Sequence, residues 1–290
     1  MIFKSPNHKI RWVKFMKSNR LLAAGLGLVL CFILFLTTKA IAAPNTYGIT
    51  NTRHNLLVPY NSTMSGMVGL LYNNYGEVCV YCHTPHGAQN SSAPLWNRAL
   101  PAGPYTPYSS STIDTNVGQP DGVSLACLSC HDGTIAVDSI INAPGSGAAW
   151  GGPVAANHYA LNQSTGAGSC LQCHSVLPNA NFTVMAFGQD LRPQHPISMN
   201  YPTAAQDSGF IPLSQWSQSG RIAWFEETGN TRADDDELKL YGDGAAGYKV
   251  QCATCHNPHG TRIGSTDNLY PTFLRKSNSS SAICTTCHIK

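Results

Sequence analysis

The chain has 290 residues and few charges, because Asp, Glu, Lys and Arg make up only 11% of it. Its 18 basic and 15 acidic residues give a formal net charge of +3, but seven of the basic residues lie among the first 42. The rest of the chain carries 11 basic and 15 acidic residues, a net charge of −4. This acidity argues against nucleic acid as a partner, since nucleic-acid-binding surfaces are rich in Lys and Arg.

Residues 1–42 have the pattern of a secretory signal peptide. Basic residues up to Arg20 precede an apolar run from Leu21 to Leu36, and the small-residue end Ala40-Ile41-Ala42 follows. These are the three regions of a cleavable signal. We therefore expect export and a mature domain of residues 43–290. The alternative is an uncleaved membrane anchor, because the apolar run is close to the length of a membrane span.

Five copies of the pattern Cys-x-x-Cys-His use ten of the eleven cysteines. This spacing is the attachment signature of c-type haem, in which two sulfurs bind the porphyrin and the histidine ligates its iron. Zinc ribbons, disulfide frameworks and thioredoxin-like motifs do not account for five copies with a histidine after each. We expect five haem c groups, with their irons, attached through Cys79/Cys82/His83, Cys127/Cys130/His131, Cys170/Cys173/His174, Cys252/Cys255/His256 and Cys284/Cys287/His288.

The histidine count matches two axial ligands for each of these haems. The chain has eleven histidines, of which His8 lies in the signal segment and five belong to the motifs. Bis-histidine ligation is one of the ordinary states of a c-type haem, and methionine is the alternative sixth ligand. The predicted distal ligands are His54, His86, His158, His195 and His259. The alternatives are Met64, Met67, Met185 and Met199.

Two of the predicted distal ligands follow a proximal histidine by three residues. On a helical turn His83 and His86 lie on one face, as do His256 and His259. Such neighbours cannot hold one iron from opposite sides. We therefore expect His86 and His259 to serve neighbouring haems, which would bring those haems close together.

The mature chain is rich in Gly, Pro, Ser and Asn and has few apolar-periodic stretches. We expect a mostly irregular fold of low secondary structure, with short helices around the attachment sites. Residues 79–87 (CVYCHTPHG) and 252–260 (CATCHNPHG) form a weak internal repeat. The acidic run 234–237 indicates a solvated helix start, since it lacks the spacing of a calcium-binding loop. Residues 249–251 indicate a short extended lead into the fourth motif.

The motifs resemble those of multihaem c-type cytochromes of the doubled-CxxCH kind. They resemble most the outer-surface cytochromes of metal-reducing bacteria that polymerise into nanowires. The resemblance covers most of residues 50–290. The matching stretches are CHTPHGA at 82–88, APLWNR at 93–98, CLSCHDGTIA at 127–136 and HPIS at 195–198.

This resemblance implies a multihaem cytochrome c fold wrapped around a chain of stacked, bis-histidine haems. It implies long-range electron conduction outside the cell or on its surface, without catalysis, by subunits that associate into filaments. It also implies that His54 is lent to a haem of the next subunit. Redox proteins or extracellular acceptors would be the other partners.

Three other functions are compatible with the same motifs. The first is a monomeric electron shuttle in the periplasm or at the cell surface, with all ten histidines used within one chain. The second is a multihaem reductase, which needs an open coordination position on one haem. The third is a membrane-anchored quinol-oxidising cytochrome, which requires the N-terminal segment to stay uncleaved.

Overall fold

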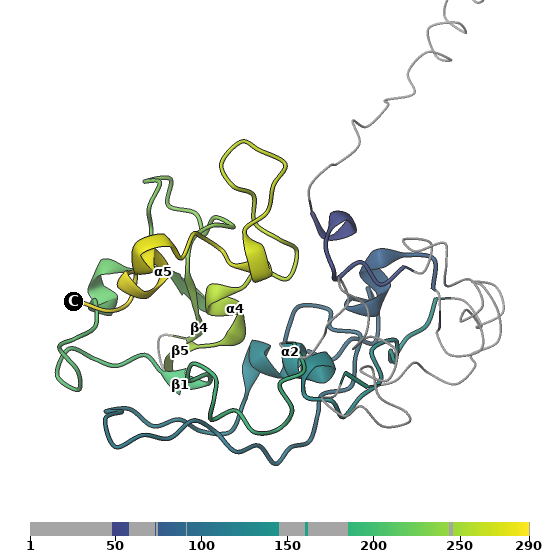
Figure 1. Cartoon of the computed structure of the whole chain (residues 1–290), viewed down its shortest axis with the longest axis horizontal. Coiled ribbons are helices and arrows are strands. Elements are labelled where there is room, and N and C mark those ends of the chain that lie inside the picture. The colour runs from purple at the N-terminus through teal and green to yellow at the C-terminus, as the bar shows by residue number, and fades with distance from the viewer. Residues whose placement is uncertain are drawn as a thin grey trace, which may run out of the picture. The chain divides into compact units, whose positions relative to one another are not determined.

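The structure is a computed structural model that describes residues 48–57, 73, 75–90, 92–144, 160–161, 185–243 and 246–289 (Figure 1). The chain divides into two units, Met1–Asn45 and Thr46–Lys290, and all described residues belong to the second. In these ranges no helix has both the length and the apolar character needed to cross a membrane. The predicted signal peptide, Met64, Met67, His158 and the third motif (Cys170, Cys173 and His174) lie outside the described residues.

A five-stranded antiparallel sheet is the largest regular element of the described chain. The order of its strands is β1-β5-β4-β3-β2. The strands are β1 (Met199–Asn200), β2 (Ser217–Ser219), β3 (Ile222–Trp224), β4 (Lys239–Asp243) and β5 (Gly247–Val250). Successive residues of a strand point to opposite faces, so its alternate residues share one face. One face of the sheet and the residues that flank its strands form the main core, which contains Met199, Tyr201, Trp216, Ala223, Leu238, Leu240, Tyr248 and Val250.

The pairing of β4 with β5 depends on a glycine. Gly242 lies opposite Tyr248 and has φ +152°. A Cβ atom built on Gly242 would lie 2.2 Å from the Gly247 carbonyl oxygen, which no side chain tolerates. Because glycine has no Cβ, the backbones of the two strands can approach closely at this position and pair.

The expected fold class, mostly irregular and wrapped around stacked haems, is wrong. The described chain contains a five-stranded antiparallel sheet, and its α-helices are three short ones. The sheet lies in the longest interval between motifs, where Leu238, Leu240, Tyr248 and Val250 alternate with more exposed residues. This two-residue period extends over only two apolar positions per strand, so the Gly- and Ser-rich composition around it concealed the strands.

The acidic run also differs from the prediction of a helix start. It forms a turn that leads into β4. Glu237 is only 1% exposed, and its carboxylate accepts the backbone N–H groups of Glu227 at 2.8 Å and Asp234 at 2.9 Å. The carboxylate therefore stabilises the turn from inside. The extended lead into the fourth motif is confirmed, because β5 ends at Val250.

Each of the four described motifs begins on a short helix. The three α-helices are α2 (Gly122–His131), α4 (Cys252–Cys255) and α5 (Ala282–Thr285), which carry the second, fourth and fifth motifs. The 3-10 helix η4 (Val78–Tyr81) carries the first, and the other 3-10 helices are η1 (Ile49–Asn51), η6 (Leu213–Gln215), η7 (Pro271–Phe273) and η8 (Ser279–Ser281). Helix α2 packs against α4 and β4, which places the second motif beside the fourth (Figure 1).

Candidate haem-binding sites

The first and fourth motifs adopt the same local structure. A returning loop forms an antiparallel bridge to each motif histidine, His83 with Trp96 and His256 with Leu274. In the first motif the Asn97 N–H donates to the Cys82 carbonyl at 2.8 Å, and in the fourth the Arg275 N–H donates to the Cys255 carbonyl at 2.8 Å. The weak sequence repeat is therefore also a structural repeat. The structure extends it from the motifs to the loops that return to them.

Backbone carbonyl groups orient the proximal histidines. The Nδ1 atoms of His83, His131 and His256 lie 2.8, 2.6 and 2.9 Å from carbonyl oxygens of residues 94, 185 and 272. A carbonyl oxygen only accepts, so Nδ1 carries the proton in each ring. Metal-ligating histidines are commonly held in this way, because the bond leaves the unprotonated Nε2 for the metal.

Two pairs of histidine rings have the separation that an iron between them requires. The ring centroids of His83 and His259 are 6.2 Å apart, and so are those of His54 and His131. A metal lies about 2 Å from a ligating imidazole nitrogen and the ring centre about 1.2 Å farther, so two axial rings have centroids roughly 6.4 Å apart. Both observed separations match this value.

The residues present fit haem c at these two sites. The first site has Cys79, Cys82 and His83, with His259 from the fourth motif as its second imidazole. The second site has the pair Cys127 and Cys130 with His131, and His54 as its second imidazole. His54 is itself oriented, because its Nδ1 lies 2.9 Å from the Pro258 carbonyl oxygen. Its ring stacks on Phe273 with centroids 4.2 Å apart.

Burial keeps these imidazoles in the form that binds metal. It lowers the pKa of His131 to about 4 and is the main cause of the lowered pKa values of His54, His256 and His259. Only a neutral imidazole has a free nitrogen lone pair for a metal. The four rings are therefore neutral, and competent as ligands, at physiological pH.

The sulfurs of cysteines from different motifs lie near one another. None of the eight described cysteines forms a disulfide. The Cys127 thiol donates a hydrogen bond to the Cys252 sulfur, which raises the pKa of Cys127 and lowers that of Cys252. This contact joins the second motif to the fourth.

The first motif lies near the second, and the fifth lies near the fourth. Burial raises the pKa of Cys82 to about 12, and the nearby Cys130 thiol adds to the effect. Burial also raises the pKa of Cys287 to about 12, with a contribution from Cys255. In space, the first motif therefore lies beside the second, the second beside the fourth, and the fourth beside the fifth.

A buried polar network holds the second motif against the fourth. The Gln251 side-chain oxygen accepts hydrogen bonds from the hydroxyl groups of Ser124 and Ser198, the latter at 3.1 Å. The Cys252 N–H donates to the Ser124 hydroxyl at 3.1 Å, and the Gln251 amide donates to the Asp121 carboxylate at 2.8 Å. Each buried polar group is thus satisfied across the junction of α2 and α4, which fixes their separation.

The other predicted ligands in the described ranges do not form histidine pairs. His86 and His195 are exposed, and within the described ranges neither lies opposite another histidine ring. The His288 ring packs against Phe210, with centroids 4.3 Å apart, and Cys284 lies on α5. Met199 is buried in the sheet core, and Met185 contributes only its carbonyl oxygen to the second site. The structure therefore pairs two of the four described proximal histidines with a distal one.

Two buried arginines near the motifs were not predicted as functional residues. Arg98 and Arg275 hydrogen-bond to carbonyl groups of the second and fourth motifs. No local sequence signal marked them, because the returning loops align Arg275 with Asn97 and not with Arg98.

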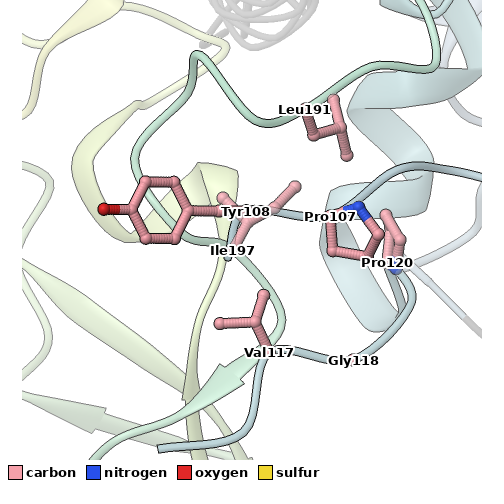
Figure 2. A pocket seen from close by; sticks show the side chains of 7 residues that line it. All are labelled: Pro107, Tyr108, Val117, Gly118, Pro120, Leu191 and Ile197. Carbon is pink, nitrogen blue, oxygen red and sulfur yellow. The ribbon is translucent and has the colours of Figure 1, made fainter. Parts of the chain in front are cut away.

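A shallow apolar pocket lies beside the second motif, because Leu191 and Ile197 of its lining belong to the same apolar cluster as Leu128. It encloses about 190 Å³, including space open to solvent, whereas ligand pockets usually have roughly 300–1,000 Å³. Figure 2 shows the residues that line it, which come from two loops. They are Pro107, Tyr108, Val117, Gly118, Pro120, Leu191 and Ile197.

In the ranges described, no three His, Cys, Asp or Glu side chains converge as a site for a bare metal ion would require. No protein-family model and no curated protein matches this sequence.

Proposed function

We propose that this chain is an electron-transfer protein with haem c at its five Cys-x-x-Cys-His motifs and no catalytic site of its own. The observation that carries the proposal is the separation of 6.2 Å in both histidine pairs. A bound haem would supply a one-electron Fe(III)/Fe(II) couple, at a potential below that of cytochromes with methionine as sixth ligand.

The side chains of the chain serve this function by attachment and orientation. The cysteines would bind the porphyrin covalently, and the paired imidazoles of the first and second sites would ligate the iron. Three of these imidazoles, those of His54, His83 and His131, are oriented by backbone carbonyl groups. An iron ligated on both sides has no position for a substrate. At these two sites the arrangement would leave no open position of the kind that a reductase needs.

The sites interlock, which favours transfer between them. His259 follows the fourth motif in sequence but lies opposite His83 of the first. His54 lies opposite His131 of the second motif and is held by Pro258, beside His259. With the cysteine contacts, this arrangement supports a path through the first, second, fourth and fifth sites.

The arrangement favours ligation within one chain over the loan of His54 to another subunit. The ring centroids of His54 and His131 are 6.2 Å apart within the same chain, so His54 would complete the second site without a partner subunit. Filament formation then requires another interface, and electron microscopy of the sheared extracellular fraction tests it. On the N-terminal pattern we propose export to the cell surface or beyond, with the periplasm as the alternative location.

Coulometric reduction of the purified haem-loaded protein, followed by visible spectroscopy, tests the proposal. We expect five electrons per chain, one for each motif, and low-spin spectra in both redox states. We also expect no CO binding by the reduced protein. Uptake of fewer electrons would contradict the proposal, and CO binding by the unaltered protein would favour a reductase.

A further inference from the structure

Arg98 is the largest by volume of the fully buried residues in the described part of the chain, with an exposure of 0%. All its hydrogen-bonding nitrogens donate to neutral oxygens. Nε donates to the Ser129 hydroxyl at 3.2 Å, and Nη2 to the Ser129 and Ala136 carbonyl oxygens at 2.9 and 2.8 Å. Nη1 donates to the Val137 and Ser139 carbonyl oxygens at 2.7 and 2.8 Å. The guanidinium is thus fully satisfied without an acid.

No ion pair joins Arg98 directly to a carboxylate in the described residues, although the charge of the buried Asp138 acts on Tyr75 as that of Arg98 does. The ion pairs there join Arg192 to Asp190, residue 249 to 121 and residue 276 to 227. The acid nearest in sequence to the acceptor carbonyls is Asp138, whose carboxylate accepts the Asn73 backbone and side-chain N–H groups at 2.7 and 3.1 Å. Buried arginines are usually paired, so an unpaired one needs an explanation.

The position of Arg98 suggests that explanation. Ser129, which binds two of its nitrogens, lies between the two cysteines of the second motif. The positive charge of Arg98 also acts on Cys82 of the first motif and on His131 of the second. The guanidinium therefore lies beside the attachment residues of two neighbouring sites.

We propose that Arg98 is a positioning residue whose fixed positive charge raises the reduction potential of the haems at the first and second sites. This inference rests on the proposed function. A ferric haem carries one more positive charge than a ferrous haem, so a nearby cation disfavours the oxidised state. The effect is strong in a buried site, where water does not screen the charge. Neighbouring charge and hydrogen bonding are the usual means by which a protein adjusts a metal site.

A second buried arginine lies beside a motif in the other half of the structural repeat, at the position that corresponds to Asn97. Arg275 is 5% exposed, and its Nε donates at 2.9 Å to the carbonyl of Ala253, which lies inside the fourth motif. Its Nη1 donates at 2.9 Å to the Asp235 carbonyl. Its charge acts on Cys255 and His256. Each half of the repeat thus has one buried guanidinium beside a motif.

Spectroscopic redox titration of the haem-loaded protein tests the proposal with three variants. Arg98→Gln removes the charge, Arg98→Lys keeps it, and Arg192→Gln makes the first change at an exposed, paired arginine. We expect Arg98→Gln to shift one or two of the five titration components to lower potential. Arg98→Lys should keep these components close to their wild-type potentials. Arg192→Gln should leave every component unchanged.

A haem assay of each preparation separates this inference from the proposed function. A wild-type protein without covalent haem would overturn the proposed function. Five haems with unchanged potentials in Arg98→Gln, or an equal shift in Arg98→Lys, would overturn the role of the Arg98 charge. If Arg98→Gln matures with fewer haems, Arg275→Gln makes the same test at the fourth site, where an unchanged potential would overturn the proposal.

Discussion

The two histidine pairs predict how many coordination positions open when distal ligands are removed. His259→Ala should open the iron at the first site, and His54→Ala the iron at the second, because each ring lies 6.2 Å from the proximal ring. The pairs share no histidine, so their effects should add. We expect the unaltered protein to bind no CO, each single variant to bind one CO per chain, and the double variant to bind two.

CO titration of the reduced proteins, followed in the Soret region, measures this stoichiometry. Phe273→Leu is the matched control, since it removes the ring that stacks on His54 at 4.2 Å but leaves every ligand in place. That variant should bind no CO. A haem-complete His259→Ala protein that binds no CO, or a double variant that binds only one, would refute the assignment of these pairs.

Three further predictions concern the fold, and each is measured by urea unfolding of the haem-loaded protein. Tyr81→Phe removes a buried hydroxyl that accepts the Tyr75 N–H at 3.2 Å and donates to the Asn73 carbonyl at 3.0 Å. We expect a loss of about 1–3 kcal/mol in unfolding free energy, and an unchanged value would contradict these bonds. Leu240→Ala should cost about 2–5 kcal/mol, because Leu240 is 0% exposed in the sheet core, and a smaller loss would contradict that packing. Burial lowers the pKa of Lys239 from 10.5 to about 8, so the unfolded chain binds more protons between these values. Stability should therefore rise with pH across that window. Lys239→Met should remove the rise, and a rise that persists in this variant would contradict the prediction.

Much of the candidate site follows from the sequence because its signals are local. The motif spacing predicts the attachment cysteines and proximal histidines directly. The three-residue spacing of His256 and His259 predicts that they serve different irons, and the ring of His259 lies opposite His83. Which distant histidines meet depends on how the loops pack, and no local pattern encodes that packing. The sequence therefore did not predict which motif His54 would approach, and the structure places it 6.2 Å from His131.

The sheet was not predicted because its strands are too short to give a clear period. Strand β4 has five residues and β5 four. Their pairing depends on the close backbone approach at Gly242 and on the tertiary core around Leu240 and Tyr248. Arg98 was overlooked because a charged residue in a loop normally lies at the surface. Only the folded chain brings together the carbonyl groups that bind it.

Intact mass spectrometry of the exported protein, purified after expression with a haem c maturation system, tests the central claim most directly. The account predicts a chain that begins at Ala43 and carries five covalently bound haems. A haem-free mass, or one lowered by the hydrogens lost in disulfide formation, would contradict it.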